Sequence, residues 1–344
     1  MQNKCVIQSI SVSLLLACSA VFSFSQTADT PIVDQTPSGM KKDDESIIEK
    51  CQQLIKEKKL LSFEEVGNQI AAPKYEPVTL ATPSSKALTV EEISERARAA
   101  HARIGYCYLC PKCDHWHLNL AGGYTIASDV VVTCDHVIKS STVMREGYLI
   151  AVDVKGNVYP VTAIMGRSYS MDTAILRVSG GDFAALPLQD AVKQGAESYC
   201  YSSPLGQKGY FSDGIINRFL WTDGYQGGDK KSIEVNRFLR VNISTDWAPG
   251  SSGSAVLDEC GNAIAHVSQI SSLGNRLGAS AYVTVHTGVP AFSVRSLVET
   301  MNTPEELSKL LAKEEKEPKR MDSSKPDKSK TPEKKKSAES ATCR

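Results

Sequence analysis

Short apolar runs separated by turn residues fill the middle of the chain. Runs such as 149–154, 158–164 and 239–244 are rich in β-branched and aromatic residues and are bounded by Gly, Pro, Asn and Asp. Runs of this length, spaced by turn signals, are typical of antiparallel strands and differ from the strand–helix alternation of βαβ units. The pattern therefore predicts an all-β domain across residues 101–300.

Helical patterns precede this domain. Residues 26–100 are polar and interrupted by prolines, and an amphipathic helix is predicted over 44–59. Two further helices are predicted to open with capping boxes, in which a Ser or Thr and a Glu three residues later satisfy each other's backbone N–H groups. These pairs are Ser62 with Glu65 and Thr89 with Glu92. We expect this region to be a partly helical extension that acts as a tether or a pro-like segment.

The two ends of the chain have other compositions. Residues 301–344 are predicted to form a short helix capped at Thr303 and then a disordered tail, because Lys, Glu, Ser and Pro dominate there. Residues 1–25 are predicted to be a signal peptide, since an apolar run follows Lys4 and is too short for a stable membrane span.

Two signal-cleavage sites compete, one before Gln26 and one before Cys18. The first is favoured because hydrophobicity continues beyond Cys18. We therefore expect an exported protein, periplasmic or extracellular, that is anchored to a membrane only if Cys18 is lipidated.

Composition narrows the classes of partner. The chain has 344 residues, 41% of them hydrophobic, and a formal net charge of zero. A chain of this length can bury a sizeable core, and a neutral balance gives no reason to expect a nucleic-acid partner.

The strongest chemical signal is the run from Asp246 to Ala255, which places Ser252 between glycines directly before an apolar strand. A glycine two residues before a serine lets the backbone turn so that two N–H groups point to one spot. The N–H groups of Gly250 and Ser252 could there stabilise the oxyanion of an acyl-transfer reaction.

Two upstream segments supply the partners that such a serine needs. His136 ends the apolar run 130–138, where it could act as a general base. Asp172 opens the apolar run 172–178, where it could orient an imidazole. Each residue alone has an ordinary structural interpretation, as a loop serine, a strand-end histidine or a turn aspartate. Together, in the order His, Asp, Ser within one domain, they favour a catalytic triad.

These segments resemble the trypsin-like serine proteases of chymotrypsin fold, and within them the HtrA/Deg branch. The family's Thr-x-x-His-Val, Asp-x-Ala-Leu-Leu-Lys-Val and Pro-Gly-Asn-Ser-Gly-Gly motifs are matched by residues 133–137, 172–178 and 249–254. Its Ala-Leu-Pro-Leu and Gly-Asn-Pro-Leu-Gly stretches are matched by residues 185–188 and 202–206.

The resemblance covers about residues 115–298. It implies two six-stranded antiparallel barrels with the active site between them, followed here by too few residues for the PDZ domain that this branch usually carries.

Two positions of the nucleophile motif depart from the family. Ser251 replaces the usual Asn or Asp, and Ser254 replaces the second glycine after the nucleophile. Neither change removes a proton-transfer group, but the loss of a glycine can restrict the turn that forms the oxyanion hole.

The resemblance also suggests residues near the substrate. Asp246 lies before the nucleophile turn, at a spacing where trypsin has an acid that selects basic side chains, and His266 lies on the strand 263–267 that borders the cleft. His286, on a later strand, is a third candidate. His101 is expected on the solvated face of a helix.

The cysteines leave two interpretations open. Cys107, Cys110 and Cys113, with His115 or His117, have the short spacing of a zinc knuckle. In an exported protein the same thiols could form disulfides, one of them reaching Cys51 or another distant thiol, and Cys200 could pair with Cys260. No metal is assigned to the catalytic site in either case.

We expect, then, a serine endopeptidase that cleaves protein or peptide substrates through an acyl-enzyme and needs no cofactor. Homo-oligomers are left open. Two alternatives belong to other classes: a catalytically silent binding or chaperone-like module with the protease fold, and a metal- or redox-responsive protein that uses the Cys107–His117 cluster.

Overall fold

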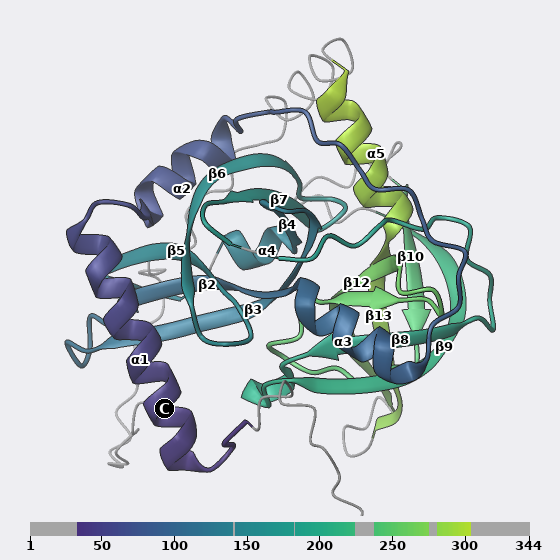
Figure 1. The fold of residues 1–344 in the computed structure, drawn as a ribbon, viewed down its shortest axis with the longest axis horizontal. Coiled ribbons are helices and arrows are strands. Elements are labelled where there is room, and N and C mark those ends of the chain that lie inside the picture. The colour runs from purple at the N-terminus through teal and green to yellow at the C-terminus, as the bar shows by residue number, and fades with distance from the viewer. Residues whose placement is uncertain (1–32, 140–141, 182, 224–236, 275–280, 304–344) are drawn as a thin grey trace, which may run out of the picture. The chain divides into compact units, whose positions relative to one another are not determined.

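The computed structural model describes residues 33–139, 142–181, 183–223, 237–274 and 281–303, and Figure 1 shows their arrangement. The predicted signal peptide and the predicted helix and tail after residue 303 lie outside these residues.

The first barrel is a ring of six antiparallel strands in the order β5-β2-β3-β4-β7-β6, closed by pairing between β5 and β6. A two-residue strand, β1 (Leu61–Ser62), pairs with β5 outside the ring. The six strands are β2 (His101–Leu109), β3 (Trp116–Ala127), β4 (Val130–Thr133), β5 (Glu146–Val152), β6 (Val158–Ser168) and β7 (Thr173–Val178).

The second barrel is also a closed ring of antiparallel strands, in the order β10-β13-β12-β11-β8-β9. Its strands are β8 (Glu197–Ser202), β9 (Tyr210–Asp223), β10 (Arg237–Ile243), β11 (Ala255–Leu257), β12 (Ala263–Gly274) and β13 (Ala281–Pro290). The prediction of an all-β domain built from two six-stranded barrels is thus confirmed.

Helices lie before, between and after the barrel strands along the chain. The longer ones are α1 (Pro37–Lys56), α2 (Phe63–Ala71), α3 (Val90–Ala100) and α5 (Ala291–Asn302), and the short ones are α4 (Asp135–Ile138) and the 3₁₀ turn η1 (Pro204–Gly206). Both predicted capping boxes are present, at the starts of α2 and α3. Within the described residues, no helix is long and apolar enough to cross a membrane.

The N-terminal extension is packed onto the first barrel. Ile47 and Cys51 of α1 are buried with Cys107 and Ile150 of the first barrel, and Figure 1 shows α1 crossing β2 and β3. Val66 of α2 is fully buried in that barrel's own core. The apolar faces of these helices therefore complete the barrel's surface.

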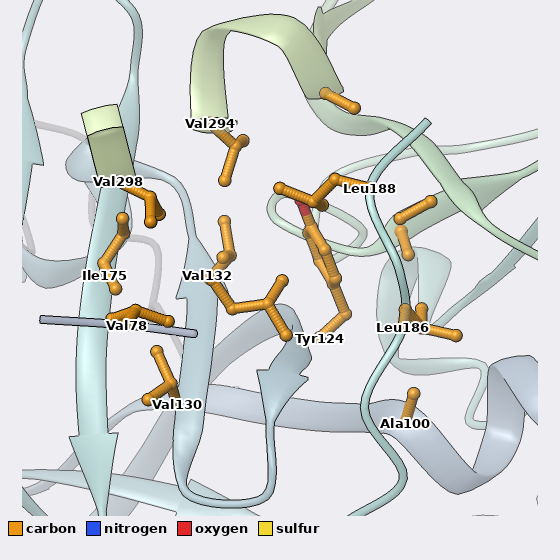
Figure 2. Packing of buried hydrophobic residues seen from close by; sticks show 14 of the residues in the cluster. Val78, Ala100, Tyr124, Val130, Val132, Ile175, Leu186, Leu188, Val294 and Val298 are labelled. Atoms are coloured by element: carbon orange, nitrogen blue, oxygen red, sulfur yellow. The ribbon is translucent and has the colours of Figure 1, made fainter. Parts of the chain in front are cut away.

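One apolar cluster joins the two barrels. It includes Tyr124 and Val132 from the first barrel, Leu186 and Leu188 from the connection between barrels, and buried residues of α3 and α5. Figure 2 shows part of this cluster, with the side chains of Tyr124, Leu186 and Leu188 beside one another. Because the cluster draws on both barrels, it fixes the relative position of the loops that they carry.

The contribution of α3 to this cluster can be measured with two substitutions in the same helix. Ile93 is 1% exposed and Val90 is 48% exposed. We expect Ile93→Ala to lower the free energy of unfolding by about 2–5 kcal/mol, because it leaves a cavity. Val90→Ala should change it by less than about 0.5 kcal/mol. Urea denaturation of both variants checks this, and equal losses would contradict the packing of α3.

Candidate functional site

His136 and Asp172 form a bonded pair at the end of the first barrel. His136 lies in α4, directly after β4, and Asp172 lies in the turn between β6 and β7. The His136 Nδ1 atom is 3.0 Å from both carboxylate oxygens of Asp172, and the His136 backbone N–H donates to Oδ1 at 3.1 Å. The imidazole is half exposed while the carboxylate is largely buried. The Nδ1 edge of the imidazole is thus fixed by the carboxylate, while half of the side chain remains accessible.

The backbone of Asp172 has a φ of 51°, a left-handed conformation that few residues other than glycine adopt. The second barrel holds it there. The Arg240 guanidinium of β10 donates to the carbonyls of Ser170 and Met171, at 2.9 and 3.4 Å. The Ser268 hydroxyl of β12 donates to Asp172 Oδ2 at 2.5 Å. The carboxylate is therefore oriented from both barrels.

A buried ion pair holds the helix that carries His136. The Asp135 carboxylate accepts from Arg167 Nε at 2.7 Å and from its Nη2 at 3.2 Å, and Lys139 Nζ lies 3.0 Å from it. Asp135 and Arg167 are both buried. Removal of Arg167 would take away the buried counter-ion of Asp135, one residue from His136, and leave Lys139 beside that carboxylate.

The pair shifts the pKa of each partner. Burial acts to lower the pKa of His136, but the hydrogen bond to Asp172 and the charges of Asp172 and Asp135 outweigh it and raise the pKa above 6.5. Burial acts to raise the pKa of Asp172, but the hydrogen bonds from His136 and Ser268 and the charge of His136 lower it below 3.8. Asp172 is therefore ionised at neutral pH and can stabilise a protonated imidazole.

The turn that carries Ser252 presents two N–H groups. Gly250 has a φ of 101°, which glycine adopts without strain. The Leu205 N–H, from η1, donates to the Pro249 carbonyl at 2.7 Å. Because a trans peptide directs its C=O and N–H to opposite sides, this bond aims the Gly250 N–H away from η1. Among the described residues, the N–H groups of Gly250 and Ser252 have no acceptor.

This turn lies against the strands that lead to His136. The Gly122 N–H of β3 donates to the Ser252 carbonyl at 2.7 Å, and the Thr133 hydroxyl donates to the Gly122 carbonyl at 2.7 Å. Thr133 lies three residues before His136. A Cβ atom on Gly253 would lie 2.3 Å from the Gly122 carbonyl oxygen, so the approach requires glycine at 253. The Ser252 hydroxyl itself has no hydrogen-bond partner among the described residues.

The two unusual serines of the motif are accommodated inside the protein. Ser251 is fully buried, and its hydroxyl lies 3.1 Å from the Ser202 hydroxyl and accepts from the Ala248 N–H at 3.4 Å. Ser254 is also buried, packed so closely to Gly122 that a Cβ atom there would lie 2.0 Å from the Ser254 hydroxyl oxygen. Ser251 stands where the family motif has Asn or Asp, and its hydroxyl is held by hydrogen bonds to neighbouring residues.

Two histidines are more buried than expected. His266 is fully buried, so it does not line a substrate pocket: its Nε2 atom is 3.2 Å from the Asp172 carbonyl oxygen, and burial lowers its pKa to about 4. His101 begins β2 and is buried beside Tyr201, so it is not on a solvated helix face.

Asp246 belongs to the segment before the Ser252 turn, and His286 contacts that segment. Asp246 is exposed, and its carboxylate accepts from the Tyr210 hydroxyl at 3.1 Å. His286 Nδ1 lies 2.7 Å from the Thr245 carbonyl oxygen, beneath this segment. Asp246 thus remains accessible to a ligand.

Sequence reasoning missed Arg240, Ser268 and Arg167, which position the pair. Each is a polar residue that interrupts a predominantly apolar run, and this interruption is the signal that could have identified it as a positioning residue. A buried polar side chain needs a partner, so such interruptions indicate a bond to a distant segment. The partners lie far along the chain: 96 residues separate Ser268 from Asp172.

The cysteine cluster divides into two groups. Cys107 is buried beside Cys51, whereas the donor atoms of Cys110, Cys113 and His117 lie within 4.8 Å of one another. Cys200 and Cys260 are both thiols in this structure.

The pKa of His136 can be followed by NMR through the imidazole proton shifts. We expect a pKa above 6.5 in the wild type and a lower one in Asp172→Asn, because the charge that stabilises the imidazolium is lost while burial remains. Glu91→Gln, which changes an exposed carboxylate in the first turn of α3, should leave the His136 pKa unchanged. A wild-type pKa retained in Asp172→Asn would show that the pair does not control the imidazole.

Comparisons with known proteins found one matching family model and 802 matching chains of solved structures. Residues 121–265 match the family model of the trypsin-like peptidase domain. No curated protein matches the chain. A crystal structure of Rv3671c from Mycobacterium tuberculosis, in the inactive form of a serine-to-alanine variant, is 16% identical, with a TM-score of 0.47 and coverage of 66% of this chain and 98% of that one. Through residues 121–265 the chain is thus similar to the trypsin-like peptidase domain.

Proposed function

We propose that this protein is an exported serine endopeptidase in which Ser252, His136 and Asp172 form the catalytic triad. The observation that carries the proposal is the His136–Asp172 pair, whose imidazole is fixed at Nδ1 and accessible at its other end. The trypsin-like peptidase domain that contains all three residues supports it.

The residues can be given roles in acyl transfer. The Ser252 hydroxyl would attack the scissile carbonyl while His136 accepts its proton, and the free N–H groups of Gly250 and Ser252 would bind the oxyanion. His136 would then give the proton to the leaving amine, and Asp172 would hold the imidazole tautomer and stabilise its charge. Water would release the acyl group by the same steps. In the described residues the Ser252 hydroxyl makes no hydrogen bond to His136, and catalytic contacts of this kind often tighten only when substrate binds.

Protein or peptide substrates follow from the peptidase domain. Within the cleft we propose Asp246 as a contact for basic side chains, because its carboxylate is exposed and stands four residues before Gly250. The predicted signal peptide supports export to the periplasm or beyond, and the motif spacing supports the HtrA/Deg branch.

A binding module that keeps the protease fold without catalysis is the second candidate. It is favoured by one observation, the absence of a hydrogen bond from the Ser252 hydroxyl to His136 in the described structure. The two candidates differ in whether Ser252 is nucleophilic.

Reaction with a fluorophosphonate probe separates them. We expect the wild-type protein to be labelled and to digest casein, and both activities to be lost in Ser252→Ala and His136→Ala. Loss of a triad residue typically costs at least about 10⁴-fold in rate. Ser46→Ala, which changes an exposed serine of α1, is the matched control and should keep full activity. A folded wild type that is neither labelled nor active on casein would contradict the proposal and favour the binding module.

The oxyanion turn has a separate test in Gly250→Ala. A Cβ atom at this position would lie 2.7 Å from the Ser203 carbonyl oxygen, and the φ of 101° is strained for alanine. The turn must therefore shift, and we expect kcat to fall about 10²–10³-fold with the fold retained. Gly67→Ala is the control, because nothing lies within 4 Å of the added Cβ in helix α2. Unchanged kcat in Gly250→Ala would exclude this N–H group as an oxyanion donor.

A further inference from the structure

The tip of the hairpin between β2 and β3 gathers three side chains that bind soft metal ions. Cys110, Cys113 and His117 each offer one donor atom, and these atoms all lie within 4.8 Å of one another. His117 Nε2 is 3.0 Å from Cys113 Sγ. Thiolate sulfur and imidazole nitrogen are the usual ligands of zinc in proteins.

The spacing of the donors suits one tetrahedral ion. Ligands about 2.0–2.3 Å from zinc lie roughly 3.3–3.8 Å from each other in tetrahedral geometry. The separations observed here, from 3.0 Å to at most 4.8 Å, bracket that range. Small side-chain rotations would therefore bring all three donors onto one ion.

The backbone of the turn is organised around Cys110. Its N–H donates to the His115 carbonyl at 2.9 Å, and its carbonyl accepts from the Asp114 N–H at 3.2 Å. Asp114 has a φ of 54°, which reverses the chain toward β3. The Lys112 N–H points to Cys110 Sγ at 3.4 Å. An N–H group directed at a ligand sulfur is an outer contact that orients it.

Cys107 lies apart from this group in the fold, although it is close to Cys110 and Cys113 in the sequence. Cys107 is fully buried on β2 in the cluster between the barrel and α1, next to Cys51. Cys113, by contrast, is partly exposed at the hairpin tip, and His117 begins the strand that follows. An ion could reach this group without any opening of the core.

We propose that Cys110, Cys113 and His117 bind one Zn²⁺ ion, with the fourth position taken by His115 or by water. The site would be structural. It lies at the tip of the hairpin, whereas Gly122, whose N–H bonds the Ser252 carbonyl, lies further along β3. Zinc would fasten the two ends of the hairpin at the point where its strands separate. This proposal does not depend on peptidase activity.

The test measures zinc bound by the full chain, purified under reducing conditions and dialysed against metal-free buffer. We expect about one zinc per chain in the wild type, and background levels in Cys110→Ser, Cys113→Ser and His117→Ala. Cys260→Ser, a change in the turn between β11 and β12 of the other barrel, is the matched control and should keep the ion. Binding retained by His115→Ala would assign the fourth position to water, and binding lost would assign it to His115.

Two measurements on the wild type alone guard against misfolded variants. Cobalt substituted for zinc should show a thiolate charge-transfer band and the strong visible bands of a tetrahedral site. Added zinc should raise the thermal midpoint of the apo protein, since an ion that binds the folded state stabilises it. A reduced wild type that takes up no zinc would overturn the proposal. So would zinc lost equally in Cys260→Ser, or a Cys110–Cys113 disulfide, found by peptide mass, that reforms in preference to zinc binding.

Discussion

The Asp172 carboxylate is the point on which the site depends, because it is held from both barrels at once. His136 bonds it from the first barrel and Ser268 from the second, while Arg240 fixes the carbonyls of the turn before it. A buried carboxylate in a left-handed backbone conformation is costly by itself. The bonds from the second barrel offset that cost, so the pair keeps its geometry only while the barrels stay docked through their shared apolar cluster.

A second constraint is the close approach of two backbones. The Ser252 turn can reach the strands before His136 only because neither Gly122 nor Gly253 has a Cβ atom at the contact. The hydrogen bond from Gly122 to the Ser252 carbonyl then fixes their distance. Side-chain bonds therefore orient Asp172 and His136, whereas glycine packing sets where Ser252 lies relative to them.

Local signals in the sequence predicted an all-β domain, two helix starts and the residues of the pair, whereas the two barrels followed from the resemblance to a known family. Alternating strands and capping boxes depend on neighbours within a few residues, and the motif around Ser252 carries its own turn. The packing of α1, the burial of His266 and the roles of Arg240 and Ser268 depend on contacts between distant segments. No short pattern encodes such contacts. The segment before residue 100 is polar in composition although its helices are packed, because the apolar faces that they bury are narrow and contribute little to composition.

The cysteines are a second case in which a short sequence pattern does not determine which residues lie together. Cys107, Cys110 and Cys113 share one spacing, and spacing alone treats them as equals. The hairpin does not: Cys107 lies within β2, where it faces the core shared with α1, whereas Cys110 and Cys113 lie in the turn that follows. Strand geometry thus reduces a cluster with several interpretations to one pair of thiols with a histidine beside it. Because that group lies at the hairpin tip and the His136–Asp172 pair is held by both barrels, the proposed metal binding and the proposed peptide hydrolysis can be tested independently.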